Sequence, residues 1–259
     1  MLADCQGFVF DLDGCVWQGS TLNPGAAATL TALHRAGRGV AFLTNNSRAR
    51  GRDIRDKLHR LGLPWVEHTL TPLEILGQVI AERFGRSRVL VIGAPELEDV
   101  VTEAGHELVG VPDFRKATVV AVGNDFDLTY ERLAAASRAA AAGAPLVTPN
   151  VDARLPIENG EFLPGCGAIV AAVSAAAGVS PLVVGKPEPP LFRIALGRLG
   201  LAPGQAAMVG DSVESDMAGG RRAGMRTVLY APEGGAPPGA ADVVVRSFAE
   251  LATLAGVRA

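Results

Sequence analysis

The stretch Phe8–Gly14, Phe-Val-Phe-Asp-Leu-Asp-Gly, constrains the fold of this chain more than any other. A continuous apolar run bounded by glycine is typical of a parallel strand covered on both faces. In open α/β sheets, ligands bind just beyond the carboxyl ends of such strands. Asp11 and Asp13 are therefore expected to face one crevice, with Gly14 permitting the turn. Two carboxylates this close need a cation between them or a retained proton. Taken alone, the pattern also fits a solvated loop.

The rest of the chain alternates between apolar runs and helical patterns, which predicts βα units and parallel sheets. Strands are expected at residues 7–10, 40–43, 89–92, 118–122, 145–147, 182–184, 206–209, 227–230 and 243–245. The pattern starts afresh near residue 88, and residues 150–167 are rich in proline and glycine. The expected fold class is α/β. Residues 1–80 and 182–259 form a Rossmann-like core, and residues 81–181 form an inserted α/β domain.

Composition excludes several classes of protein. Of the 259 residues, 48% are hydrophobic and 20% are charged, which are ordinary globular values. The net charge is −3 and the basic residues are scattered, so we expect neither a nucleic-acid nor a membrane partner. No apolar run reaches the roughly 18 residues of a transmembrane helix, and the start lacks a signal segment, so a cytoplasmic location is expected. Three cysteines and four histidines show no ligand spacing for zinc.

Polar groups directly follow four of the expected strands, and this coincidence is hard to attribute to chance. They are Asp11 with Asp13, Thr44 with Asn45 and Asn46, Lys186, and Asp211 with Asp216. Three carboxylates make a site for a hard divalent cation such as Mg²⁺. A lysine, a threonine hydroxyl and backbone N–H groups would hold phosphate oxygens. The set therefore predicts phosphoryl transfer. A second Asp-x-Asp pattern, Asp125 and Asp127, is interpreted as turn and capping residues before a helix that begins near Thr129.

These residues resemble the motifs of a known family. In their usual order, Asp11-Leu12-Asp13-Gly14, Thr44, Lys186 and Gly210-Asp211 to Asp216 resemble the four motifs of the haloacid dehalogenase superfamily of phosphatases. The insertion resembles the large C2-type cap of the subclass that contains the NagD-type and 4-nitrophenyl phosphate phosphatases. Further stretches resemble that subclass: Leu43–Ser47, Leu128–Glu131, Leu163–Gly165 and Val184–Pro187. The resemblance covers essentially the whole chain, and it implies a cap at residues 81–181.

The resemblance implies a role for each motif residue. Asp11 would attack phosphorus and form an aspartyl-phosphate, and Asp13 would act as acid and then as base. Mg²⁺ would be bound by Asp11, Asp211 and the Asp13 backbone carbonyl, with Asp216 supporting these ligands. Equatorial oxygens of the phosphoryl group would be held by Thr44, Lys186 and the backbone of Asn45 and Asn46. A homodimer through the cap and a small-molecule phosphate ester as substrate are also implied.

Some positions depart from the family pattern. Ser212 and its neighbours stand where relatives commonly have Arg-Leu, and Cys15 stands where Thr or Val is usual. Cys15 is interpreted either as plain packing or as a redox-sensitive residue. Residues 150–156 align with the substrate-selecting loop, where Leu155 argues against pyridoxal phosphate and Asp152 or Arg154 could contact a leaving group or simply be solvated.

Two other functions stay open at this point. A receiver-type signalling module also joins an acidic cluster, a Thr and a Lys on a parallel sheet, but it should have about half this length. A Mg-independent dehalogenase of the same superfamily would have no use for Asp13, because displacing a halide needs no acid for the leaving group. The sequence does not identify which phosphate ester is the substrate.

Overall fold

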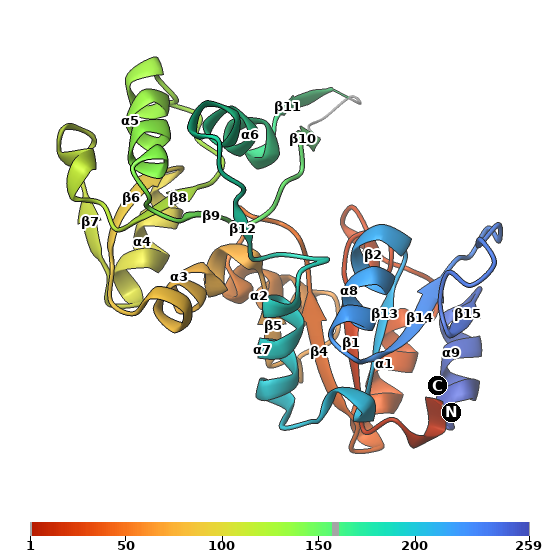
Figure 1. The fold of residues 1–259 in the computed structure, drawn as a ribbon. Coiled ribbons are helices and arrows are strands. Elements are labelled where there is room, and N and C mark those ends of the chain that lie inside the picture. The colour runs from red at the N-terminus through yellow and green to blue at the C-terminus, as the bar shows by residue number, and fades with distance from the viewer. Residues whose placement is uncertain (1, 157–160, 259) are drawn as a thin grey trace. The chain divides into compact units, whose positions relative to one another are not determined.

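The computed structural model describes residues 2–156 and 161–258, which form two compact units (Figure 1). The first unit contains the chain up to residue 44, residues 50–70 and the chain from residue 186. The second contains residues 45–49 and 71–185. Each unit is a parallel sheet with helices, so the expected α/β class is confirmed. Among the described residues, no helix has both the length and the apolar character needed to cross a membrane.

The first unit is built on a six-stranded parallel sheet with the order β15-β14-β13-β1-β4-β5. Its strands are β1 (Gly7–Asp11), β4 (Gly39–Leu43), β5 (His68–Leu70), β13 (Ala206–Gly210), β14 (Arg226–Tyr230) and β15 (Val243–Val245). Its helices are α1 (Ala26–Arg35), α2 (Gly51–Arg60), α7 (Pro189–Leu199), α8 (Ala218–Arg222) and α9 (Phe248–Ala255). An antiparallel hairpin of β2 (Trp17–Gln18) and β3 (Thr21–Leu22) follows β1. Short 3₁₀ turns lie at Leu2–Asp4 and Pro203–Gln205, and a π-helical turn lies at Val213–Met217.

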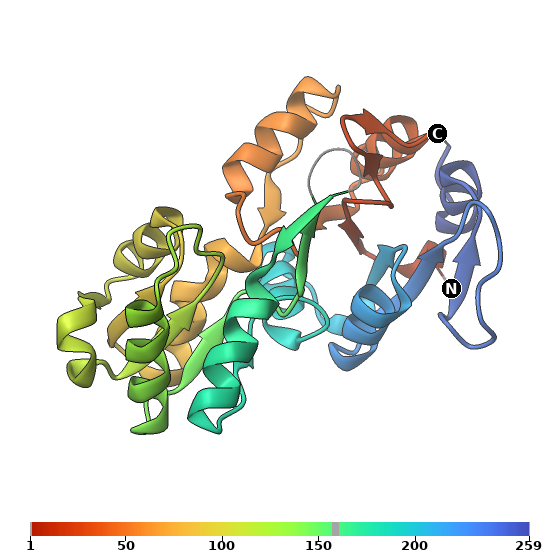
Figure 2. The same ribbon diagram turned by 90° about the horizontal axis from the view of Figure 1, so that it is seen from above.

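The core of the first unit surrounds β1. All five residues of this strand are buried, as expected for a strand with a neighbour on each side and helices on both faces. Figure 2 shows α7 and α8 on one face of the sheet and α1 and α9 on the other. The ring of Phe10 stacks on those of Phe8, Phe42 and Phe248, with ring centroids 6.0 to 6.4 Å apart. This aromatic core fixes the strand whose end carries Asp11.

The second unit has a five-stranded parallel sheet with the order β12-β9-β8-β6-β7. Its strands are β6 (Arg88–Ile92), β7 (Glu107–Val109), β8 (Val119–Val122), β9 (Leu146–Thr148) and β12 (Leu182–Val183), with an antiparallel pair of β10 (Arg154–Pro156) and β11 (Phe162–Pro164). Its helices are α3 (Pro72–Phe84), α4 (Pro95–Glu103), α5 (Tyr130–Ala141) and α6 (Cys166–Ala177), and a 3₁₀ turn lies at Val111–Lys116.

The main segment of the second unit starts at residue 71, whereas the sequence placed the start of the insertion at residue 81. The reason is the packing of α3 against α4. A Cβ on Gly77 of α3 would lie only 2.5 Å from the carbonyl oxygen of Val100, so the two helices approach each other at a glycine. His106 also contacts α3 at this glycine: its Nε2 lies 2.9 Å from the Gly77 carbonyl oxygen, while its Nδ1 accepts a hydrogen bond from the Ser87 amide.

The strand before Lys186 is placed differently from the sequence-based prediction. Residues 182–184 were assigned to the core sheet, but β12 pairs with β9 of the second unit. Lys186 therefore does not follow a strand of the core sheet. It belongs to the segment that leads into α7 of the first unit. An apolar run of two or three residues does not reveal which sheet it joins, because both sheets are parallel and buried.

Candidate active site

The strand order of the first unit brings three of the predicted positions to one edge of the sheet. β1 lies between β13 and β4, and all three strands are parallel. Asp11 is the last residue of β1 and is in register with Leu43 of β4, so Thr44 comes one residue beyond that level. Asp211 follows Gly210 at the end of β13. The carboxyl ends of neighbouring parallel strands thus carry a carboxylate, a hydroxyl and a second carboxylate.

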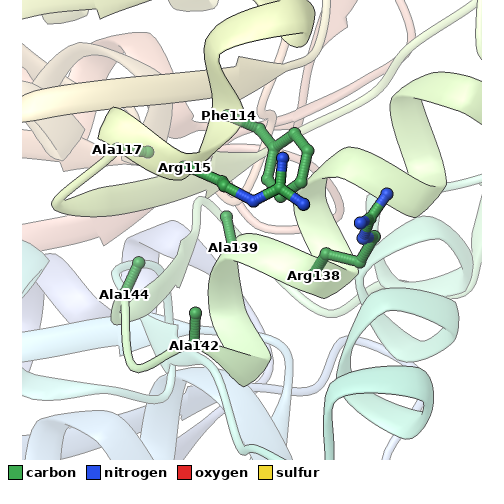
Figure 3. A pocket seen from close by; sticks show the side chains of 7 residues that line it. All are labelled: Phe114, Arg115, Ala117, Arg138, Ala139, Ala142 and Ala144. Carbon is green, nitrogen blue, oxygen red and sulfur yellow. The ribbon is translucent and has the colours of Figure 1, made fainter.

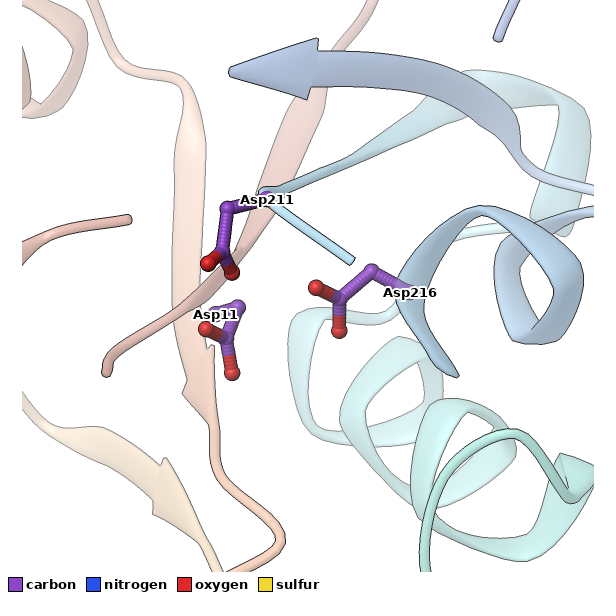
Figure 4. A group of neighbouring side chains, drawn as sticks. All are labelled: Asp11, Asp211 and Asp216. Atoms are coloured by element: carbon purple, nitrogen blue, oxygen red, sulfur yellow. The ribbon is translucent and has the colours of Figure 1, made fainter. Parts of the chain in front are cut away.

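A group of three carboxylates lies at this edge (Figure 4). Asp11, Asp211 and Asp216 each have an oxygen within 4.8 Å of the others. Asp11 and Asp216 are buried, whereas Asp211 is exposed. Two glycines make room for the group, because a Cβ on Gly14 would overlap the Asp211 carboxylate and a Cβ on Gly210 would overlap that of Asp216. Gly14 also has φ +89°, a conformation that other residues rarely adopt.

Lys186 is the cation of this cluster. Its ammonium donates to Asp11 and, over 2.6 Å, to Oδ1 of Asp216, and only 3% of its side chain is exposed. Burial alone would lower the pKa of Lys186, but Asp216 and Asp11 outweigh this effect and raise its pKa above the usual value. Lys186 therefore stays charged and holds the orientation of Asp11. The predicted convergence of Asp11, Lys186 and Asp211 is what the structure shows.

The carboxylates of this cluster repel one another, and their pKa values are raised. Burial raises the pKa of the Asp11 carboxyl to about 7, and although Lys186 opposes this rise, Asp216 and Asp211 add to it. Desolvation and Asp216 also raise the pKa of Asp211. Both shifts arise because carboxylates crowd together in a poorly solvated place. The chemistry of this donor set fits a hard divalent cation such as Mg²⁺, which would relieve the repulsion.

Asp216 comes from the turn that follows β13. It lies inside the π-helical turn and is completely buried. Ser212 is the capping residue, since its side chain accepts from the Ser215 amide. Both oxygens of Asp216 accept hydrogen bonds, one from Lys186 and one from the Ser212 amide over 3.1 Å. These two bonds occupy both oxygens of Asp216 and hold its carboxylate in place behind Asp11 and Asp211.

Asp13 lies at the exposed side of the site and is held by two donors. The indole Nε1 of Trp17 donates to Oδ1 over 2.7 Å, and the hydroxyl of Thr44 donates to Oδ2 over 3.2 Å. The sequence-based prediction included Asp13 and Thr44 but missed Trp17. A signal was present, because Gly14 permits a tight turn just after Asp13, and this turn brings position 17 close to position 13.

Asn45 and Asn46 belong to the second unit, together with Ser47, Arg48 and Ala49. The Asn45 carbonyl accepts a hydrogen bond from the side chain of Asn150 over 2.8 Å. The side chain of Asn46 accepts from the backbone amides of Arg48 and Ala49. The structure thus shows what orders these two residues within their unit. Their predicted contact with a phosphoryl group stays a prediction.

Cys15 is a packing residue in this structure. Its side chain is fully buried, and its thiol faces the Val209 carbonyl at 3.9 Å. Burial raises the pKa of this thiol well above its ordinary value, and the neighbouring carboxylates add to the effect. Because the thiolate is the reactive form, the structure favours packing over redox sensitivity.

The second unit contains a hollow of about 360 Å³ (Figure 3). The guanidinium groups of Arg115 and Arg138 each lie 4.8 Å from the ring centroid of Phe114. The rest of the lining consists of small apolar side chains, at Ala117, Ala139, Ala142 and Ala144. Without a carboxylate or nucleophile in its lining, this hollow offers no groups for phosphoryl transfer.

Two family models match the chain. Residues 8–107 match a haloacid dehalogenase-like hydrolase model, and residues 183–251 match a model described as HAD-hydrolase-like. An acid sugar phosphatase of Staphylococcus haemolyticus is 34% identical over 224 residues, covering 86% of this chain and 84% of that protein. A human glycerol-3-phosphate phosphatase is 33% identical, covering 88% of this chain and 79% of that protein.

Solved structures resemble this one over nearly the whole chain. The crystal structure of a 4-nitrophenylphosphatase from Thermotoga maritima superposes with a TM-score of 0.84 at 30% sequence identity and covers 98% of both chains. These similarities favour a phosphatase over a receiver module or a dehalogenase.

Proposed function

Since the chain belongs to the haloacid dehalogenase-like hydrolases and is a phosphoric monoester hydrolase, we propose that it uses Mg²⁺ and an aspartyl-phosphate on Asp11 to hydrolyse small phosphate monoesters. The observation that carries this proposal is the convergence of Asp11, Lys186, Asp211 and Asp216 at one sheet edge. A carboxylate nucleophile next to a buried ammonium and two further carboxylates suits phosphoryl transfer better than any other reaction class.

In the proposed reaction, a carboxylate oxygen of Asp11 forms a bond to phosphorus while the ester P–O bond breaks. Asp13 gives its proton to the departing alkoxide. A water molecule then attacks phosphorus, Asp13 takes the proton of this water, and the bond between phosphorus and Asp11 breaks. Lys186 holds Asp11 in place throughout. Thr44, Lys186 and the backbone of Asn45 and Asn46 would hold the equatorial oxygens of the phosphoryl group.

Asp11, Asp211 and the Asp13 backbone carbonyl would bind the Mg²⁺ ion, with Asp216 behind them. When bound, the ion supplies positive charge that screens the nucleophile from the substrate dianion. In the chain itself, Lys186 partly meets this need, since it pairs with both buried carboxylates.

The substrate proposed is the phosphate ester of a small polar alcohol. The relatives are named acid sugar phosphatase, glycerol-3-phosphate phosphatase and 4-nitrophenylphosphatase, and these names all indicate phosphate monoesters of small molecules. The second unit, residues 45–49 and 71–185, is proposed to act as the cap, within which residues 150–156 would select the substrate. A homodimer through the cap and a cytoplasmic location stay predictions.

The proposal is tested by replacing the nucleophile. We expect Asp11→Asn to lower phosphate release from 4-nitrophenyl phosphate in Mg²⁺ by at least about 10³-fold, because the amide cannot attack phosphorus. Asp127→Asn is the matched control, since it changes the exposed second carboxylate of the other Asp-x-Asp pattern. Phosphate release is measured with folding checked by circular dichroism. A folded Asp11→Asn protein with a near-normal rate would exclude Asp11 as the nucleophile.

A further inference from the structure

Trp17 is held rigidly beside Asp13 by the chain around it. Only 3% of its surface is exposed. Its backbone N–H donates to the Leu12 carbonyl over 3.0 Å, and its carbonyl accepts from the Gly14 amide over 2.9 Å. Burial restricts the indole, and its Nε1 lies 2.7 Å from Oδ1 of Asp13.

Two more residues brace the hairpin. The side-chain amide of Asn23 donates to the carbonyls of Gly14 and Cys15, over 3.1 and 2.6 Å. The ammonium of Lys57, from α2, lies 3.6 Å from the centroid of the Trp17 ring and donates to the Gly19 carbonyl over 2.8 Å. Lys57 thus connects α2 to the turn between β2 and β3 and to the face of the Trp17 indole. A cation on the face of an indole is attracted by the ring and draws electron density from it, which strengthens the N–H as a donor.

The two oxygens of Asp13 have partners of different kinds. An indole N–H can only donate a hydrogen bond, so Oδ1 facing Trp17 must accept and has no place for a proton toward this partner. A threonine hydroxyl can donate or accept, so the contact of Thr44 with Oδ2 is compatible with a protonated or an ionised oxygen. Of these two contacts, only the one at Oδ2 can accept a hydrogen bond from a protonated Asp13.

We propose that Trp17, supported by Lys57, is a positioning residue for Asp13: it fixes Oδ1 as a hydrogen-bond acceptor and leaves Oδ2 to carry the transferred proton. This inference rests on the proposed function. In the first half-reaction the proton leaves Oδ2 for the ester oxygen as the P–O bond breaks. In the second it returns to Oδ2 from water as the bond between phosphorus and Asp11 breaks. A proton shared between both oxygens would be aimed correctly only part of the time.

The test compares two esters that differ in their need for an acid. The 4-nitrophenolate ion is a good leaving group without protonation, whereas the alkoxide of glycerol 3-phosphate needs a proton from Asp13. We measure ester cleavage by rapid quench in a single turnover, with enzyme in excess. Trp17→Phe removes the N–H and keeps an aromatic ring. It should slow cleavage of the alkyl ester about tenfold or more, and cleavage of the aryl ester by less than about twofold.

Trp65 provides the matched control, because it is the other of the two tryptophans and its Nε1 donates to Thr31 rather than to the site. Trp65→Phe should leave both cleavage rates unchanged. In this background Trp17 is the sole tryptophan, so biosynthetic replacement by 3-benzothienylalanine changes only position 17. That analogue keeps the shape of the indole and has sulfur in place of N–H. It should reproduce the selective loss even where Trp17→Phe folds poorly.

A smaller effect of the same kind is expected for Lys57→Met, which keeps the aliphatic stem over the ring and removes the charge. Alkyl-ester cleavage should fall about threefold with KM unchanged. An equal rise of KM for both esters would assign Lys57 to substrate binding and overturn its supporting role.

The outcomes separate the two proposals. If the wild-type enzyme cleaves neither ester, or if Asp11→Asn remains active, the proposed function fails. If the wild-type enzyme cleaves both esters and the loss of the Trp17 N–H slows both equally, or slows neither, Trp17 is only a packing residue and the inference is overturned.

Discussion

The two units share an architecture, but the carboxylates that follow their strands are neutralised to different degrees. In the second unit, the carboxylate after β8 is neutralised locally: Asp125 pairs with Arg132 over 2.8 Å, and its other oxygen accepts from the Asp127 amide. In the first unit, Asp11 and Asp216 share the ammonium of Lys186. Burial and the neighbouring carboxylates raise the pKa of Asp11 to about 7. The ionic partner of Asp125 among the described residues is an arginine, Arg132.

This difference shows what separates a structural Asp-x-Asp pattern from a chemical one. Both patterns occur near the end of a buried strand, so position alone does not distinguish them. A carboxylate that pairs with an arginine of its own stabilises a turn, and both of its oxygens already have hydrogen-bond donors. Where several carboxylates surround one lysine, negative charge exceeds positive charge, so a further cation is favoured at this place. Such a cation would in turn favour binding of a phosphoryl group.

The largest expected effect comes from removing the cation of each region. Lys186→Met leaves two buried carboxylates without their partner and should destabilise the first unit by about 3 kcal/mol or more. Arg132→Met leaves Asp125 with one hydrogen bond, from the Asp127 amide. Because the Arg132 side chain is 26% exposed, its loss should lower the stability of the second unit by only about 1 kcal/mol. Hydrogen exchange of amides in β1 and β8 measures the two units separately.

The same pair of variants tests the contrast in activity. Lys186→Met should lower turnover of 4-nitrophenyl phosphate by at least about 10²-fold, as expected for loss of a charged group at the proposed reacting centre. Arg132→Met should leave the rate near that of the wild type. Equal stability losses in β1 and β8, or equal activity losses, would contradict the distinction between the two regions.

A smaller effect is expected from the metal. Mg²⁺ at about 100 times its dissociation constant should stabilise the first unit by about 2.7 kcal/mol, because an ion that binds only the folded state adds its binding free energy. Exchange in β1 should slow accordingly, and exchange in β8 should not. Asp211→Asn removes one proposed ligand at the exposed side of the site and should abolish the response. Protection of both units, or protection that survives Asp211→Asn, would place the ion elsewhere.

Much of this arrangement could be predicted from the sequence because it depends on local patterns. The apolar run before Asp11 predicts a buried strand, and parallel strands must bring their carboxyl ends to one edge, which is why Asp11, Thr44 and Asp211 meet. β12 was assigned to the wrong sheet, since its two residues carry no signal for their partner. β5 was missed because His68-Thr69-Leu70 is short and half polar.

Side-chain partners were harder to predict than strands. The contact between Trp17 and Asp13 depends on the turn over residues 12–17: Gly14 indicates a turn there, but no periodicity encodes which side chains the turn brings together. Asp216 is buried within a π-helical turn, an irregular element that the hydrophobic pattern does not reveal. Hydrophobic pattern determines elements, whereas the pairing of single polar groups is determined by tertiary geometry.

The smallest expected effect concerns two buried thiols, one in each unit. Burial raises the pKa of both Cys15 and Cys166, so the reactive thiolate forms only at higher pH than for an ordinary cysteine. Neither should react with a thiol reagent at neutral pH except through opening of its unit, as followed by mass spectrometry. Mg²⁺ should then slow the labelling of Cys15, which lies in the first unit, and leave that of Cys166 unchanged. Rapid labelling of Cys15 in the folded protein would instead make it a reactive residue near Asp11, the proposed nucleophile, and the contrast between the units would extend to redox chemistry.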